Sequence, residues 1–274
     1  MSFFIKKIKP QRKATLQSTQ SSLSSDKSIN SVFSVSSVVV LILLWQGTSA
    51  SGIVPPYMLP SPVQIIVAAV KDSSLLLTHL VQTLKEAAAG LGLALAVSFI
   101  LAVFMDSNKF IKKTVTPLLT LTQTMPVIAL APLLVLWMGY GSAPKIALIF
   151  LTCFFPLTVG LLGAFSQAGE DEIRLLKSMG ANRGQLYRYI KFPQSLGAFF
   201  SSFRISVSYS VIGAVIAEWL GGERGLGVYM IRVRKSYSFD RMFAAIVIVS
   251  LLSLFLIKLV EFIERMSMPW RKGE

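Results

Sequence analysis

Long apolar stretches dominate the chain. Six of them approach the length of a membrane-crossing helix, at about residues 30–47, 86–105, 116–138, 146–165, 202–220 and 242–260. About 20 residues rising 1.5 Å each cross a hydrocarbon core of about 30 Å, and a helix satisfies its own backbone polar groups there. The pattern does not alternate between apolar and polar residues as a barrel strand would. It predicts an all-α polytopic membrane protein with six transmembrane helices.

The segments around the first stretch need separate interpretation. Residues 1–29 are basic and rich in Ser, which predicts a disordered cytoplasmic tail. The apolar run before Thr48-Ser49-Ala50 also resembles a signal-peptide core, but the polar segment ahead of it is far longer than usual, which favours a retained helix. Four prolines over 55–62 exclude a helix there, and the short run Val63–Val70 predicts a surface helix outside the membrane.

The distribution of Lys and Arg orients the spans. With the N-terminus inside, cytoplasmic segments hold 19 of the 27 basic residues and outer segments hold 8. This bias predicts that both termini are cytoplasmic. The expected organisation is a transmembrane domain over 30–265 with a cytoplasmic loop at 166–201, outer loops at 48–85 and 220–241, and a cytoplasmic tail at 266–274.

Composition supports a membrane protein and excludes several other classes. The 274 residues are 53% hydrophobic and 15% charged, with a mean hydropathy of +0.64, whereas soluble chains carry about 25% charged residues. The net charge of +14 fits cytoplasmic orienting charge better than nucleic-acid binding. The single Cys153 is expected to be a packed small hydrophobe, and the single His79 a structural residue, so no metal or cofactor is expected in this chain.

Residues 166–201 form the longest polar insertion between spans. Glu170, Asp171 and Glu172 suit a helix N-terminus, and Gly180 suits the end of that helix. A second short helix is expected over Asn182–Ile190, stopped by Phe192-Pro193. The apolar face of these two short helices could pack against the protein's own helix ends or against a cytoplasmic partner.

This loop resembles the EAA loop of ABC-importer permeases, whose pattern is E-A-A, three residues, G, nine residues, I-x-L-P. Gly180, nine residues and Ile190-Lys191-Phe192-Pro193 match the second half, with Phe in place of Leu, whereas Arg174-Leu175-Leu176 stand at the E-A-A positions. Glu86-Ala87-Ala88 with Gly92 fits the first half literally but begins at the outer end of an apolar span, so we interpret it as small-residue helix packing.

The resemblance extends over about residues 55–265. The chain is similar to binding-protein-dependent permeases of the nitrate, sulfonate, taurine and thiamine-precursor group, and looks most like the hydroxymethylpyrimidine type. The runs that carry the resemblance to the group are Leu59–Pro62, Met125-Pro126, Ala129–Leu133, Trp137–Gly141, Phe154–Pro156, Glu218–Gly221 and Gly225–Gly227. The hydroxymethylpyrimidine likeness is carried by Tyr209–Gly213, Glu218-Trp219 and Tyr229–Arg232.

The resemblance implies a type I ABC-importer permease fold in a bacterial inner membrane, and a homodimer. The partners it implies are an ABC ATPase dimer, which holds the ATP and Mg, and an extracytoplasmic substrate-binding protein. The implied ATPase-coupling residues are Glu172, Leu176, Gly180, Ala181, Leu186, Ile190, Phe192 and Pro193. The expected cargo is a thiamine-precursor pyrimidine, with sulfonate, taurine, nitrate or riboflavin-like solutes as alternatives.

Two other classes of function, an ion-coupled secondary transporter and an intramembrane enzyme, fit the sequence less well than a permease that depends on a separate ATPase. The sequence has no G-x-x-x-x-G-K-[ST] phosphate loop, and Gly221–Gly227 lacks the Lys, so we interpret that segment as a turn and expect a separate subunit to hydrolyse ATP. An ion-coupled secondary transporter would show two related halves with broken helices, and no internal repeat is evident. An intramembrane enzyme would need a nucleophile with a base, or paired acids.

Five residues are candidates for the substrate path. Ser206, Tyr209 and Ser210 lie on one arc of the fifth expected span, where either close helix packing or path lining would explain the small residues. Glu218 lies near its outer end, either as an interface residue paired with Arg232 or as a gate or substrate contact. Gln123 lies beside the interruption that Pro126 and Pro132 are expected to cause in the third span.

Overall fold

The computed structural model describes residues 36–37, 39–52, 55 and 58–269, and all regular elements in that part of the chain are helices. The chain divides into two compact units, residues 1–66 and 67–274, which are described separately. The expected tail over 1–29 lies outside the described residues, as do 30–35 of the first expected span and 270–274 of the last segment.

The first unit contains an apolar helix over Val39–Ala50 and the start of α2 (Pro62–Lys71). The Val39–Ala50 helix is shorter than a membrane crossing, so the first of the six expected spans stays a prediction. The run over 63–70 is helical, as expected, and forms α2; its location outside the membrane stays a prediction. It begins with a reciprocal cap, in which the Ser61 amide donates to Gln64 Oε1 (2.9 Å) and the Gln64 amide to Ser61 Oγ (3.3 Å).

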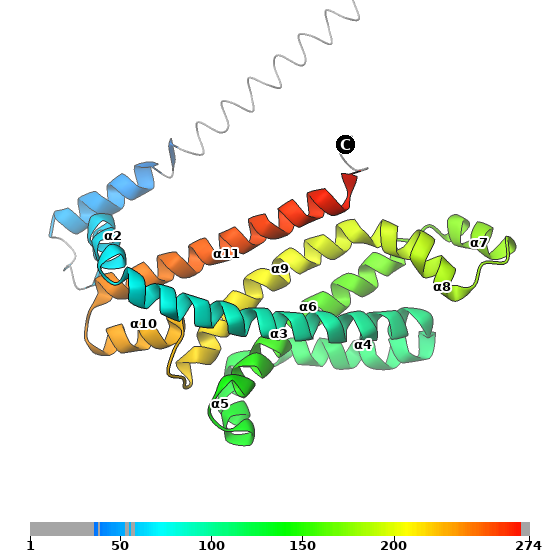
Figure 1. Cartoon of the computed structure of the whole chain (residues 1–274), viewed down its shortest axis with the longest axis horizontal. Helices are drawn as coiled ribbons and strands as arrows, with labels where there is room; N and C mark the ends of the chain where they lie inside the picture. Colours follow the sequence, from blue (N-terminus) through cyan, green and yellow to red (C-terminus); the bar gives the residue numbers. More distant parts are fainter. Residues whose placement is uncertain (1–35, 38, 53–54, 56–57, 270–274) are drawn as a thin grey trace, which may run out of the picture. The chain divides into compact units, whose positions relative to one another are not determined.

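The second unit is built on four helices that are long and apolar enough to cross a membrane: α3 (Ser73–Ser107), α6 (Ser142–Ser166), the helix that continues from Arg183 through α9 (Phe192–Trp219), and α11 (Phe239–Ser267). Figure 1 shows α3 lying alongside α6 and α9, and α11 alongside α9. The expected spans at 146–165 and 242–260 fall within these helices, and the expected span at 202–220 ends one residue beyond α9.

Two of the outer loops expected from the sequence contain helix in the second unit. Helix α3 begins at Ser73, not near 86, so much of the expected outer loop over 48–85 is helical. Its early turns are held by burial of Leu76, His79 and Thr83 at helical spacing against other elements. The short helix α10 (Leu226–Lys235) likewise occupies part of the expected outer loop at 220–241.

The expected third span, 116–138, is not one kinked helix. Helix α4 (Lys109–Thr124) and helix α5 (Val127–Met138) meet at 95°, as a broken span or a re-entrant pair. Met125 and Pro126 both have extended backbone, because a proline disfavours the α conformation of the residue before it and donates no hydrogen bond. Pro132, also expected to interrupt the span, lies within α5.

Small residues let α3, α6 and α9 approach closely. A Cβ on Gly90 of α3 would lie 2.6 Å from Cβ of Ile149 on α6, and one on Gly160 of α6 would lie 2.0 Å from Oγ of Ser202 on α9. This confirms small-residue packing around Glu86–Gly92, although Gly90 and not Gly92 makes the contact. Cys153 is buried and its thiol donates to the Ser206 carbonyl (3.3 Å), as expected for a packed small residue.

Candidate functional site

The polar insertion forms α7 (Glu170–Ser178), a glycine turn, α8 (Arg183–Leu186) and the π-helical turn η1 (Tyr187–Lys191). We call Glu170–Lys191 the α7–η1 segment. Gly180 has φ +85°, its amide donates to the Lys177 carbonyl (3.0 Å), and the Ala181 amide donates to the Leu176 carbonyl (3.0 Å). This is a Schellman motif, so the expected glycine reversal is confirmed.

The second short helix starts as expected but does not stop. Asn182 and Gln185 form a capping box, with hydrogen bonds of 2.8 and 2.9 Å. The expected stop at Phe192-Pro193 was wrong, because η1 continues directly into α9, with Pro193 in its first turn. Proline is tolerated there, and the wider π turn gives the Phe192 amide a partner five residues back, the Tyr187 carbonyl.

The apolar face of the α7–η1 segment is covered in one half and open in the other. Leu186 and Ile190 are buried within the chain, and Leu176 is partly exposed. Three large side chains in the segment are exposed: Leu175 (61%), Met179 (76%) and Tyr189 (63%). Helical periodicity places Met179 and Tyr189 on the apolar faces of this segment, but it does not show which part of a face the rest of the chain covers. Leu186 and Ile190 were therefore expected to couple to the ATPase, whereas Leu175, Met179 and Tyr189 are the exposed side chains.

Polar contacts attach the α7–η1 segment to the ends of α3 and α9. The Asp106 carboxylate, at the end of α3, accepts from the Tyr187 hydroxyl (2.5 Å) and from the Lys191 ammonium. The Glu172 carboxylate accepts from the Gln194 side chain near the start of α9. A movement of this segment would therefore be transmitted to the beginning of α9 and the end of α3.

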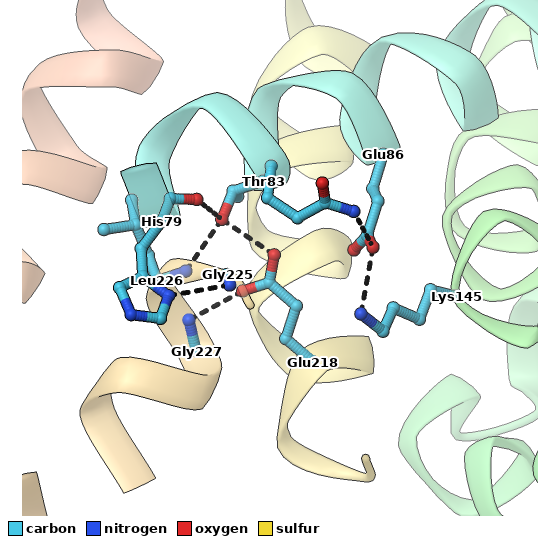
Figure 2. A network of polar contacts seen from close by, with 9 residues as sticks. His79, Thr83, Glu86, Lys145, Glu218, Gly225, Leu226 and Gly227 are labelled. Atoms are coloured by element: carbon cyan, nitrogen blue, oxygen red, sulfur yellow. Dashed lines mark hydrogen bonds and ion pairs between the residues drawn. The ribbon is translucent and has the colours of Figure 1, made fainter. Parts of the chain in front are cut away.

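At the other end of α9, the N-terminus of α10 is capped by side chains of two other helices (Figure 2). The first N–H groups of an α-helix have no partner inside the helix. Three consecutive amides here, those of Gly225, Leu226 and Gly227, each donate to a side chain. The acceptors are, in order, His79 Nδ1 (2.9 Å), Thr83 Oγ1 (2.8 Å) and Glu218 Oε2 (2.6 Å).

Glu218 is the centre of this cap. It is buried, and its second oxygen accepts from the Thr83 hydroxyl (2.7 Å). The expected pairing with Arg232 was wrong, since the Arg232 guanidinium donates to the Glu223 carbonyl (3.5 Å). A Cβ on Gly225, which has φ +134°, would lie 2.2 Å from Cδ of Glu218. The turn interpretation is confirmed for Gly221–Gly225, whereas Leu226 and Gly227 already belong to α10. His79 is confirmed as a structural residue.

Next to this cap lies a buried ion pair between α3 and α6. Lys145 Nζ donates to Glu86 Oε1 (2.9 Å), which also accepts from Gln82 Nε2 (2.8 Å). The two charged residues are 5% and 2% exposed (Figure 2). No sequence pattern indicated this pair, whose members lie 59 residues apart.

The other path candidates are not gathered at one place. Ser206 and Ser210 are buried on α9, and their hydroxyls donate to carbonyls of their own helix, Ser202 (3.0 Å) and Val207 (2.7 Å). Tyr209 is exposed on α9, and Gln123 is exposed at the end of α4 beside the 95° break. Among the described residues, no group of three or more His, Cys, Asp or Glu could hold a metal ion.

Apolar helices that pack through small residues, with one polar helical segment between two of them, are typical of a multi-pass membrane protein. A family model described as "Binding-protein-dependent transport system inner membrane component" matches residues 88–267, and the chain belongs to this family. It is therefore an inner-membrane permease subunit of an ABC importer, which works with an ATPase and a substrate-binding protein and is not itself an enzyme.

Two characterised relatives and one solved structure support this assignment. The formylaminopyrimidine transport permease protein ThiX of Halalkalibacterium halodurans is 38% identical over 86% of this chain and 94% of its own. The riboflavin transport system permease protein RibX of Chloroflexus aurantiacus is 31% identical over 85% of this chain and 88% of its own. A crystal structure of an amino acid ABC transporter with histidines shares the fold, with a TM-score of 0.62 and 16% identity over 73% of this chain and 97% of that one.

Proposed function

We propose that this permease carries an aminopyrimidine precursor of thiamine across the inner membrane. The observation that supports the proposal most is the 38% identity to ThiX, which extends over 86% of the chain. The resemblance to hydroxymethylpyrimidine permeases rests on Tyr209–Gly213, Glu218-Trp219 and Tyr229–Arg232, and Glu218 of these runs caps α10.

The test is uptake by the reconstituted importer. The chain is co-purified with its ATPase and binding protein, placed in proteoliposomes and supplied with ATP and labelled hydroxymethyl-aminopyrimidine. We expect ATP-dependent accumulation that excess unlabelled aminopyrimidine abolishes and that riboflavin, taurine and nitrate leave intact. Competition by riboflavin alone would instead assign the chain to RibX-like cargo, and accumulation without the ATPase would favour an ion-coupled transporter.

We further propose that the α7–η1 segment docks in the ATPase through Leu175, Leu176, Met179 and Tyr189. These side chains are exposed or partly exposed, while Leu186 and Ile190 hold the segment against the rest of the chain. Gly180 and Ala181 form the turn, Phe192 and Pro193 begin α9, and Glu172 joins the two through Gln194. Exposed apolar side chains of this size mark interaction sites when they gather on one element.

The permease is expected to act as a homodimer on an ATPase dimer, because one repeated docking segment per chain suits two-fold symmetry. Mass measurement of the purified complex should give two copies per ATPase pair, and one copy would contradict the proposal. Tyr209 and Gln123, the exposed path candidates, would then face the path or the dimer seam, whereas Ser206, Ser210 and Glu218 would shape it from within the packing.

A further inference from the structure

A polar cleft opens beside the buried ion pair, at the end of α9 that lies away from the α7–η1 segment. Its volume is about 670 Å³, and its walls include Gln82, Glu86, Tyr140, Lys145, Glu223 and Arg224. Small-solute sites have volumes of about 300–1,000 Å³ and a few polar groups that fix orientation. This cleft lies on the face opposite the ATPase-docking segment, which is where a binding protein would deliver cargo.

The ion pair in its wall has unused hydrogen-bonding capacity. Glu86 Oε1 accepts two hydrogen bonds, but Glu86 Oε2 is buried and has no partner among the residues that the structure describes. A carboxylate can accept about four hydrogen bonds and an ammonium can donate three. A buried acceptor without a hydrogen bond is costly, so a rotation of the Glu86 side chain that brings Oε2 to the cleft, where an occupant can donate to it, would be favoured.

The loop after α9 leaves room for this arrangement. A Cβ on Gly222 would lie 2.6 Å from Lys145 Nζ, so a larger residue there would displace the ammonium from its place beside Glu86. The Tyr140 ring, 84% exposed, is placed against Gly221, where a Cβ would lie 3.0 Å from the ring. The cleft therefore combines an acceptor, a neighbouring donor and an open aromatic ring.

We propose that this cleft is a solute site that recognises the edge of a planar nitrogen heterocycle, in which an exocyclic N–H stands beside a ring nitrogen. The exocyclic N–H donates to Glu86 Oε2, Lys145 donates to the ring nitrogen, and the ring lies on Tyr140. This inference rests on the proposed transport of an aminopyrimidine, and it assigns the residues that select that class.

The charges of the cleft also select against the cargo of more distant family members. Glu86 and Glu223 balance Lys145 and Arg224, so the walls carry no net charge. A sulfonate or nitrate that approached Lys145 would also meet the Glu86 carboxylate, which lies 2.9 Å from that ammonium and would repel it. A neutral solute with one donor and one acceptor side by side meets both groups favourably.

The test compares two solutes in the reconstituted importer. Uptake is measured for the hydroxymethyl-aminopyrimidine and for an analogue with a methyl group in place of the amino group, each at a concentration that saturates the binding protein. The wild type should prefer the amine, and Glu86→Gln should shrink that preference roughly ten- to hundredfold, the range for a hydrogen bond to a charged group. The matched control is Glu261→Gln, which removes the carboxylate of the Lys258 ion pair on α11 and should leave the preference within about twofold.

A second variant keeps the test decisive if Glu86→Gln fails to assemble because it leaves Lys145 unpaired. Glu86→Gln with Lys145→Gln buries no unpaired charge and should assemble while still losing the preference. An assembled double variant that prefers the amine as the wild type does would overturn this inference and leave the proposed function intact. A wild-type importer that carries neither compound would overturn both.

Discussion

The cap of α10 makes a sharp prediction at Glu218, because two substitutions there should differ widely in effect. In Glu218→Gln the new amide can turn its oxygen to the Gly227 N–H and its NH₂ to Thr83 Oγ1. The Thr83 hydroxyl can then donate to the His79 carbonyl, which lies 3.2 Å away, while still accepting from Leu226. Every polar group keeps a hydrogen-bond partner. The free energy of unfolding falls only by the difference between a charged and a neutral hydrogen bond, about 1 kcal/mol.

Glu218→Ala removes these partners altogether. The Gly227 amide, which donates to Glu218 over 2.6 Å, is left buried and unpaired, at a cost of about 1–3 kcal/mol. Glu218 is only 1% exposed, so removing its side chain also leaves a buried cavity. The expected total loss of stability in Glu218→Ala is about 3–5 kcal/mol. The Ala variant should therefore disrupt the turn at Gly225, and the Gln variant should not.

The assay is the temperature at which half of the purified permease–ATPase complex remains assembled, measured together with uptake. Membrane complexes unfold irreversibly, so the ranking of variants carries the test. We expect the Gln variant to stay within a few degrees of wild type with near-normal uptake, and the Ala variant to fall well below it. An Ala variant that assembles as stably as the Gln variant would refute the capping role. A Gln variant that assembles like wild type but transports no better than the Ala variant would assign the charge to gating or to substrate.

Three further outcomes are expected. Gly180→Val should leave membrane insertion normal but abolish transport and binding-protein stimulation of the ATPase, because a β-branched residue resists φ +85°; full transport by this variant would place coupling elsewhere. Leu175→Asp with Met179→Asp should weaken ATPase co-purification without lowering permease yield, and unchanged co-purification would remove these residues from the docking surface. Gly90→Ala should destabilise the permease in a thermal scan by forcing α3 and α6 apart, whereas Gly92→Ala, with nothing within 4 Å, should not; equal effects would contradict the packing.

The sequence by itself determined the features that depend on local pattern. The apolar stretches at 146–165 and 242–260 fall within single helices, and that at 202–220 matches α9 to within one residue, because the length of an apolar stretch is a property of contiguous residues. The acidic first turn of α7 and the reversal at Gly180 follow from dipole and backbone preferences that act within a few residues. The motif order around these elements was enough to indicate the family.

Only the tertiary structure decided which neighbours each residue meets. Lys145 and Glu86 lie 59 residues apart, and Thr83 and Glu218 lie 135 apart, so no periodicity could have joined them. The early start of α3 depends on what its first turns pack against, and sequence alone assigned one interruption to both Pro126 and Pro132 although the chain turns at Pro126. Local propensity fixes where a helix can form, whereas long-range packing fixes where it ends and which of its polar groups are buried, paired or left available to a solute.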